Sequence, residues 1–229
     1  MAIDQLGHYY TQDSLGGLYK YSPQGKQLFY YQNRTLGNGF QIDVRDPFSI
    51  LLYYQEYTAL IYLDRTLNEL AQYNLASQGF LGVSQVATAQ DNQVWIYDPQ
   101  DFSLKKIDPY GRVLKKSQDL SLQIGSGLQI EDILVSNAQV YLRTPTGLLR
   151  FNLFGQFQKE IILPSGQVLQ VKERSVLLKT EQSIQEYVFF PGNQQTLFNT
   201  DRLMAQLFLR NQRVYASSLG KVWIYSLKE

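Results

Sequence analysis

The chain has 229 residues, enough for one large β domain, and its 21 Lys and Arg against 20 Asp and Glu leave a formal net charge of +1 at pH 7. Basic residues adjoin only as Lys-Lys pairs at 105–106 and 115–116, which excludes the dense positive stripe that nucleic-acid binding requires. The lack of cysteine excludes disulfides, thiolate zinc sites and cysteine nucleophiles, and no apolar run is long enough for direct membrane insertion.

A five-residue phrase recurs along the chain, in which the end of an apolar strand leads through polar residues to Gly or Asn. Its copies are Tyr21-Ser22-Pro23-Gln24-Gly25, Asp64-Arg65-Thr66-Leu67-Asn68, Ile107-Asp108-Pro109-Tyr110-Gly111, Phe151-Asn152-Leu153-Phe154-Gly155 and Val188-Phe189-Phe190-Pro191-Gly192. The final Gly or Asn residues lie 43, 43, 44 and 37 residues apart, and both types tolerate the positive φ of a tight turn. An all-strand repeat of about 40 residues predicts one four-stranded propeller blade per repeat.

The strands of each blade, lettered A to D in chain order, are predicted from runs of β-branched and aromatic residues. The B strands are expected at 9–11, 50–53, 94–97, 140–142, 176–178 and 214–216, and the C strands at 18–21, 59–63, 104–107, 148–151, 184–188 and 222–225. D strands follow the turns, for example at 28–31, 113–115 and 157–161. The A strands are expected at 40–44, 83–86, 130–135, 168–171 and 204–209.

These strands predict an all-β chain that folds as a single domain over residues 1–229. The expected fold is a six-bladed β-propeller of four-stranded antiparallel blades, closed between its N- and C-terminal strands. Residues 2–6 either supply the A strand of the first blade or complete the last blade, and both placements give six blades. Tyr53, Trp95, Tyr141 and Tyr215 recur in B strands, where we expect them to form a packing layer between blades.

The clearest copy of the repeat is Ile107-Asp108-Pro109-Tyr110-Gly111-Arg112-Val113, an apolar strand, Asp, two free positions, Gly and a further apolar strand. Over about residues 8–229 this pattern resembles the repeat of NHL-type and related six-bladed propellers, with the Asp replaced before most turns. The resemblance implies a fold that most often displays loops for binding peptides, proteins or glycans, and only sometimes an enzyme site.

No catalytic residue, metal site or cofactor is predicted. The one histidine, His8, directly precedes the first B strand, which leaves a catalytic triad or an imidazole metal site without its usual residues. Propeller enzymes that resemble gluconolactonases place carboxylates on the inner strands, and here Asp43, Glu131 and Asp132 lie on predicted A strands. We interpret these three as turn-capping or solvated strand-end residues.

Aromatic residues outside the strands are the candidates for binding, because packing does not require them there. The predicted binding residues are Tyr57, Asp101, Phe102, Tyr110 and Phe154, together with the loop at 119–129. The expected contact surface is the face with the B–C loops and the D–A crossings. The 27 Gln against 11 Lys indicate a surface poor in charge, which suits a protein interface. We therefore predict a non-catalytic protein-interaction module, a subunit of a larger bacterial assembly such as one of the cell envelope.

Two alternatives stay open: a glycan-binding, lectin-like propeller and a metal-dependent propeller hydrolase. The B–C loops do not repeat, as Glu56-Tyr57-Thr58 and Pro145-Thr146-Gly147 show, and this divergence favours one protein partner over a repeated small ligand. The composition, rich in Gln, Asn and Tyr, favours an exported protein, periplasmic or extracellular, over a cytoplasmic one. The N-terminal residues do not resemble a signal peptide.

Overall fold

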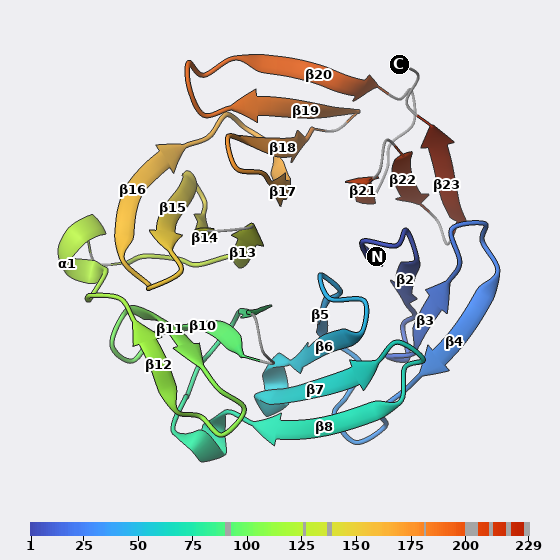
Figure 1. The fold of residues 1–229 in the computed structure, drawn as a ribbon, viewed down its shortest axis with the longest axis horizontal. Coiled ribbons are helices and arrows are strands. Elements are labelled where there is room, and N and C mark those ends of the chain that lie inside the picture. The colour runs from blue at the N-terminus through green and yellow to red at the C-terminus, as the bar shows by residue number, and fades with distance from the viewer. Residues whose placement is uncertain are drawn as a thin grey trace. The chain divides into compact units, whose positions relative to one another are not determined.

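The computed structural model describes residues 1–89, 93–125, 127–136, 139–180, 182–199, 206–210, 213–218 and 221–226. These residues form six antiparallel sheets, and within each sheet the strands lie side by side in chain order (Figure 1). Besides strands they contain one short helix, α1 (Ser121–Ile124), and two 3-10 turns, η1 (Gln55–Tyr57) and η2 (Ala76–Gln78). No helix in this described part is long and apolar enough to cross a membrane.

The chain divides into two compact units, Ala2–Ile162 and Leu163–Glu229 together with Met1. The first unit contains four four-stranded sheets, with the strands β1 (Ala2–Ile3), β2 (Tyr9–Gln12), β3 (Leu18–Tyr21), β4 (Gln27–Tyr31); β5 (Gln41–Asp43), β6 (Ser49–Tyr54), β7 (Ala59–Asp64), β8 (Glu69–Asn74); β9 (Val86–Thr88), β10 (Val94–Asp98), β11 (Ser103–Ile107), β12 (Val113–Lys116); β13 (Asp132–Ser136), β14 (Gln139–Thr144), β15 (Gly147–Asn152) and β16 (Phe157–Ile162).

The second unit contains a four-stranded sheet and, in its described residues, a three-stranded sheet. Their strands are β17 (Gln167–Val171), β18 (Ser175–Lys179), β19 (Ser183–Val188), β20 (Gln194–Asn199); β21 (Gln206–Arg210), β22 (Arg213–Ser218) and β23 (Lys221–Ser226). The prediction that residues 1–229 act as a single domain stays a prediction.

The six sheets confirm the predicted fold class, a six-bladed β-propeller. All B and C strands lie within two residues of their predicted bounds, and β1 pairs with β2 as the A strand of the first blade. The A strand expected at 83–86 lies instead at Val86–Thr88, and the carbonyl of Val83 before it accepts the Tyr53 hydroxyl at 2.6 Å. Of the strand expected at 204–209, residues 204 and 205 lie outside the described part and β21 covers the rest.

The turns between C and D strands are closed by the same hydrogen bonds in four sheets. The side-chain oxygen of the first turn residue accepts the backbone N–H groups two and four positions later, as Asp108 does at 3.0 Å from both Tyr110 and Arg112. The equivalent acceptors in the other three sheets are Ser22, Asp64 and Asn152. In these four sheets a short side chain with an oxygen acceptor therefore defines the turn.

In the second sheet, the prediction that Asn68 is the residue with positive φ in the C–D turn was wrong. The residue with positive φ is Leu67, at 64°, and not Asn68, while Gly111 holds the corresponding place in the third sheet at 78°. Leu67 donates its N–H to the carbonyl of Asp64, as Gly111 does to that of Asp108. The side chain of Leu67 is buried in the core, and this burial offsets the strain of its left-handed backbone.

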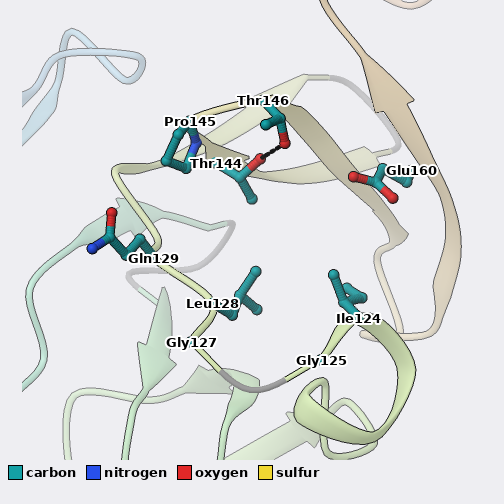
Figure 2. Close-up of a pocket in the computed structure, with 9 residues that line it drawn as sticks. All are labelled: Ile124, Gly125, Gly127, Leu128, Gln129, Thr144, Pro145, Thr146 and Glu160. Atoms are coloured by element: carbon teal, nitrogen blue, oxygen red, sulfur yellow. Dashed lines mark hydrogen bonds between the residues drawn. The ribbon is translucent and has the colours of Figure 1, made fainter.

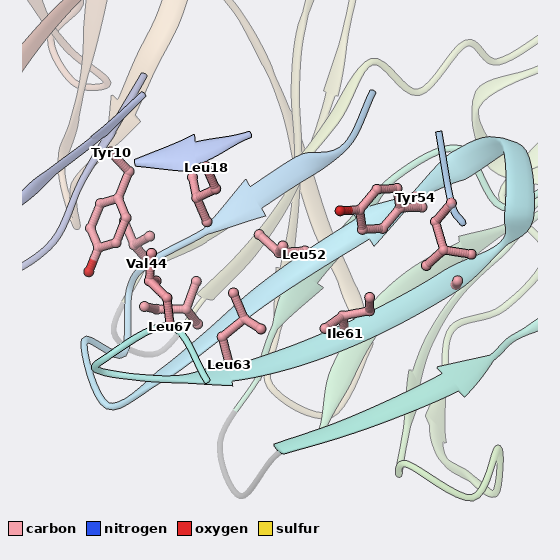
Figure 3. Close-up of a cluster of buried hydrophobic side chains, with 11 residues drawn as sticks. Tyr10, Leu18, Val44, Leu52, Tyr54, Ile61, Leu63 and Leu67 are labelled. Atoms are coloured by element: carbon pink, nitrogen blue, oxygen red, sulfur yellow. The ribbon is translucent and has the colours of Figure 1, made fainter. Parts of the chain in front are cut away.

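The central strands are buried on both faces because alternate side chains contribute to different clusters. On β6, Ile50, Leu52 and Tyr54 belong to the cluster shared with the first sheet, whereas Leu51 and Tyr53 belong to the cluster shared with the third sheet. Figure 3 shows part of the former cluster, in which side chains of the first and second sheets lie together. This alternation explains why the B and C strands are nearly continuous apolar runs rather than half-polar ones.

The aromatic residues of the B strands are buried, and two of the four lie in the packing layer predicted between blades. Tyr53, Trp95, Tyr141 and Tyr215 are all fully buried. Tyr53 and Trp95 lie in the two successive clusters on either side of the third sheet. These rings therefore contribute to the core and are not accessible for binding.

Candidate interaction surface

The B–C loops and D–A crossings of the first unit are connected by hydrogen bonds. The N–H of Leu75, in the second crossing, donates to the carbonyl of Thr58 in a B–C loop at 2.8 Å. The side-chain amide of Gln100, in the next B–C loop, donates to the carbonyl of Gly79 at 3.1 Å. We use the name loop surface for the B–C loops at 55–58, 99–102 and 145–146 with the crossings at 75–85, 117–125 and 127–131.

Phe102 lies in the B–C loop of the third sheet with a φ of 50°, a backbone region that favours glycine. Its carbonyl accepts the N–H of Leu120 at 2.9 Å, and the carboxylate of Asp98 accepts the N–H of Gln100 at 2.9 Å earlier in the loop. The ring is nevertheless 40% exposed. A strained backbone position persists only where its surroundings fix it, so the loop holds an exposed aromatic ring in place.

Tyr57 occupies a similar position in the B–C loop of the second sheet. It ends η1, and the following residue, Thr58, has a φ of 48°. The side-chain amide of Asn74 donates to the carbonyl of Tyr57 at 2.9 Å, and the side chain of Tyr57 stays exposed. Two neighbouring blades therefore display an aromatic residue from a hydrogen-bonded B–C loop.

Asp101, next to Phe102, is part of an ion-pair network. Its carboxylate lies 2.7 Å from both Lys105 Nζ and Lys116 Nζ, and Ser103 donates its hydroxyl to it at 2.5 Å. Partial burial alone would raise the pKa of Asp101, but the hydrogen bonds from Lys105, Lys116 and Ser103 lower it to about 2. Lys105 is itself buried and also pairs with Asp98 at 2.6 Å. These contacts fix the loop that carries Phe102.

The crossing after the third sheet contains the short helix α1. Asp119 accepts the N–H and the hydroxyl of Ser121 at 2.8 and 2.6 Å, which orders the start of this turn. Leu120 is fully buried, whereas Leu122 is 86% exposed. The anchored backbone therefore presents a large apolar side chain to solvent beside the Phe102 loop.

A pocket of about 230 Å³ lies where this crossing meets the B–C loop of the fourth sheet. In Figure 2, Ile124 and Leu128 point into the space below Thr144 and Thr146, and Glu160 lies at its edge. Pro145, between the two threonines in the chain, also lines the pocket. Residues 124, 125 and 127–129 of the predicted loop thus line one side of this pocket.

The remaining two predicted binding residues lie elsewhere. Tyr110 follows β11 and Phe154 follows β15, in C–D turns at the opposite ends of these strands from the B–C loops. Both side chains are exposed, and Lys115 Nζ lies 5.3 Å from the ring centre of Phe154. The structure therefore brings Asp101 and Phe102 together with the 119–129 loop and separates Tyr110 and Phe154 from them. That these residues bind a partner stays a prediction.

Two of the three carboxylates predicted on A strands, Asp43 and Glu131, pair with arginine. Asp43, at the end of β5, pairs with Arg45 and accepts the backbone N–H of Thr88 at 2.8 Å. The guanidinium of Arg45 also donates to the carbonyls of Thr88 on β9, at 2.8 Å, and Val135 on β13, at 3.3 Å. Arg45 therefore bridges the A strands of three successive sheets.

The pKa of Asp43 reflects this arrangement. Burial alone would raise the pKa, but the charge of Arg45 and the hydrogen bonds from Arg45 and Thr88 lower it to about 2. Near the fourth sheet, Glu131 pairs with Arg143 at 2.7 Å, and burial raises the pKa of Asp132. Within the described residues no group of three or more His, Asp or Glu side chains is placed to hold a metal ion.

Comparison with known proteins gives no match to any protein-family model and none to a curated protein sequence. Several solved structures are similar in fold. Virginiamycin B lyase from Staphylococcus aureus aligns with a TM-score of 0.59 and 9% identity over 100% of this chain and 83% of that one. The WD40 domain of Neurospora crassa Pan2 aligns with a TM-score of 0.61 and 10% identity, over 99% and 74% respectively.

A third similar structure is the extracellular domain of a B. thetaiotaomicron protein described as a one-component system. Its TM-score is 0.61 at 13% identity, over 98% of this chain and 33% of that one. At these identities the likeness shows the fold alone, the class of six-bladed and related β-propellers. A lyase and a WD40 domain both stand among the matches, so the fold does not decide between catalysis and binding.

The sequence did not single out three residues to which the structure gives a role at the candidate sites. Leu122 lies within the predicted 119–129 loop, but its exposure depends on the turn of α1, which is too short to show a helical periodicity. Glu160 is one of several polar residues of a D strand, and only the fold brings it to the pocket. Arg45 has a sequence signal, since a basic residue two positions after Asp43 is suited to pair with it.

Proposed function

We propose that this chain is a non-catalytic module that binds a protein partner through the loop surface. The observation that carries the proposal is the exposure of Phe102 and Leu122 on backbone that hydrogen bonds hold in place. Apolar side chains on preorganised loops lose little conformational entropy on binding, and aromatic residues are typical anchors of protein interfaces. A subunit of a larger bacterial assembly is the context that we propose for this activity.

The chemistry of the chain supports binding over catalysis. A variant of virginiamycin B lyase with a histidine replaced by alanine is described as catalytically inactive. This chain has one histidine, His8, which lies in the first A–B turn with Nδ1 3.1 Å from a carboxylate oxygen of Asp4. Asp43 on β5 and Glu131 just before β13 are paired with arginine, so neither is a free acid or base, and Asp132 is the remaining carboxylate of the predicted A strands.

A lectin-like propeller is the alternative that the loop surface supports less well. The B–C loops of the second and third sheets display Tyr57 and Phe102, but that of the fourth displays Pro145 and Thr146. A repeated glycan site would present the same side chains in each blade. The differences favour a single, extended partner.

Replacing Leu122 with aspartate is expected to reduce capture of the partner at least about tenfold, since it places a charge in the apolar centre of the proposed interface. The measurement is the amount of the main partner recovered with the tagged protein from its source organism after gentle cross-linking, by quantitative mass spectrometry. Leu122 is 86% exposed, so the substitution leaves the core intact.

Tyr110→Ser serves as the matched control, because it removes an exposed aromatic residue from the other end of the blade. We expect this variant to retain the partner. Retention by Leu122→Asp together with loss by Tyr110→Ser would place the interface on the C–D turns and contradict the proposal.

A further inference from the structure

We propose that the pocket beside α1 receives a lysine side chain from an extended segment of the partner, an inference that rests on the proposed function. The pocket volume of about 230 Å³ is below the range of about 300–1,000 Å³ that is typical of sites for drug-sized molecules. It suits a single long side chain better than a whole metabolite. It also lies within the loop surface, where a partner segment would pass.

The walls of the pocket suit an aliphatic stem. Ile124 and Leu128 point into the pocket from one side, across from Thr144 and Thr146, so methylene groups entering the pocket would contact two apolar side chains (Figure 2). Burial of each methylene contributes about 0.8 kcal/mol. A short polar side chain would not reach far enough to gain from these contacts.

The edge of the pocket suits a positive charge. Among the described residues Glu160 makes no ion pair, whereas the two acidic residues of the crossing are engaged, Asp119 with Ser121 and Glu131 with Arg143. Glu160 is exposed and lies opposite the apolar wall. A carboxylate at the end of an apolar channel is complementary to a side chain with an aliphatic stem and a terminal ammonium group.

Of the two threonines at the pocket, Thr146 provides a further acceptor. Thr144 is occupied within its own loop, because its hydroxyl oxygen accepts the N–H of Gly147 at 3.1 Å. The hydroxyl of Thr146 lies 3.3 Å from that of Thr144 and keeps capacity to accept another hydrogen bond. An ammonium group has three donors in a compact arrangement and can use separate acceptors such as Glu160 and Thr146. A guanidinium is larger and is best matched by a bidentate, coplanar carboxylate, which favours lysine over arginine.

The test uses the full chain and three capped tripeptides, acetyl-Gly-X-Gly-amide with lysine, norleucine or arginine at X. Norleucine has the lysine stem without the ammonium group. Binding is followed by NMR through the methyl resonances of Ile124 and Leu128. We expect saturable shifts with the lysine peptide, at an affinity about fivefold or more above that of norleucine, and a preference that declines as ionic strength rises.

The Glu160→Gln variant is expected to abolish the lysine preference and to leave norleucine binding unchanged. Retained norleucine binding also shows that the pocket of the variant is intact. Equal affinities for lysine and norleucine, a preference for arginine, or no shift at Ile124 and Leu128 would each overturn the lysine proposal.

The experiments distinguish failure of the proposed protein interface from failure of the proposed lysine site. If the peptides do not bind while Leu122→Asp still abolishes partner capture, the loop surface binds its partner without a lysine in the pocket. If the lysine peptide binds and Leu122→Asp has no effect on capture, the pocket is a lysine site but the proposed interface is wrong.

Discussion

Replacing Gly147 with alanine is expected to destabilise the protein by about 3 kcal/mol, the upper end of the effect of overpacking a core. A Cβ atom at this position would lie 2.1 Å from the carbonyl oxygen of Ile161 on the neighbouring strand β16. Because the obstacle is backbone, no rotation of a side chain can relieve the clash, and β15 or β16 must move. The measurement is the free energy of unfolding from urea denaturation.

Gly39→Ala is the matched control, since a Cβ at Gly39 would meet no atom within 4 Å. We expect its effect to stay within about 0.5 kcal/mol, as for ordinary surface substitutions. Because Gly147 ends the loop of Pro145 and Thr146, its substitution should also disturb the pocket. A Gly147→Ala variant as stable as the Gly39→Ala variant would contradict the packing of β15 against β16 described above.

Replacing Arg45 with methionine is expected to cost about 2 to 3 kcal/mol at pH 7. Removing one partner of a fully buried ion pair costs about 3–5 kcal/mol, and the lower value applies because the Arg45 side chain is 33% exposed and that of Asp43 is 16% exposed. The substitution also removes hydrogen bonds to carbonyls on β9 and β13. Urea denaturation of the two proteins gives the difference.

The same substitution has a pH signature. In the native protein the pKa of Asp43 is lowered to about 2, so its stabilising effect is present above the pKa of about 4 in the unfolded chain and is lost as the pH falls towards 2. Without Arg45, burial would raise the pKa of Asp43, so the variant gains relative stability in acid. The stability difference between the two proteins should therefore shrink between pH 6 and pH 2. A constant difference over this range would show that the lost contacts are not ionic.

The fold could be predicted from the sequence to a large extent because its determinants are local. The strands are runs of β-branched and aromatic residues, and the C–D turns of the first four sheets each need only one acceptor side chain and one residue with positive φ. The failure at Leu67 is informative, since a buried leucine took the place that turn chemistry assigns to Gly or Asn. There the tertiary contact outweighed the local preference.

The candidate site could be predicted only in part, because its geometry depends on contacts between distant segments. The sequence marks Phe102 and the 119–129 loop as candidates, but the contact between Phe102 and Leu120 comes from the packing of the third blade. The pocket joins residues of a crossing, a loop and a D strand, and no spacing rule connects Leu128 with Glu160. Tyr110 and Phe154 were grouped with Phe102 by residue type alone, although they lie at the other end of their strands.

The Ser, Asp and Asn side chains that close the C–D turns have a consequence for how such a chain can diverge. Ser22, Asp64, Asp108 and Asn152 supply the same oxygen to the same two N–H groups, so exchange among them is nearly neutral for the turn. The amino-acid sequence of each repeat can then change while the turn keeps its geometry. Sequence similarity between such proteins is therefore lost long before the fold is lost. This accords with solved structures of similar fold at 9% to 13% identity and with the absence of a match to a family model or a curated sequence.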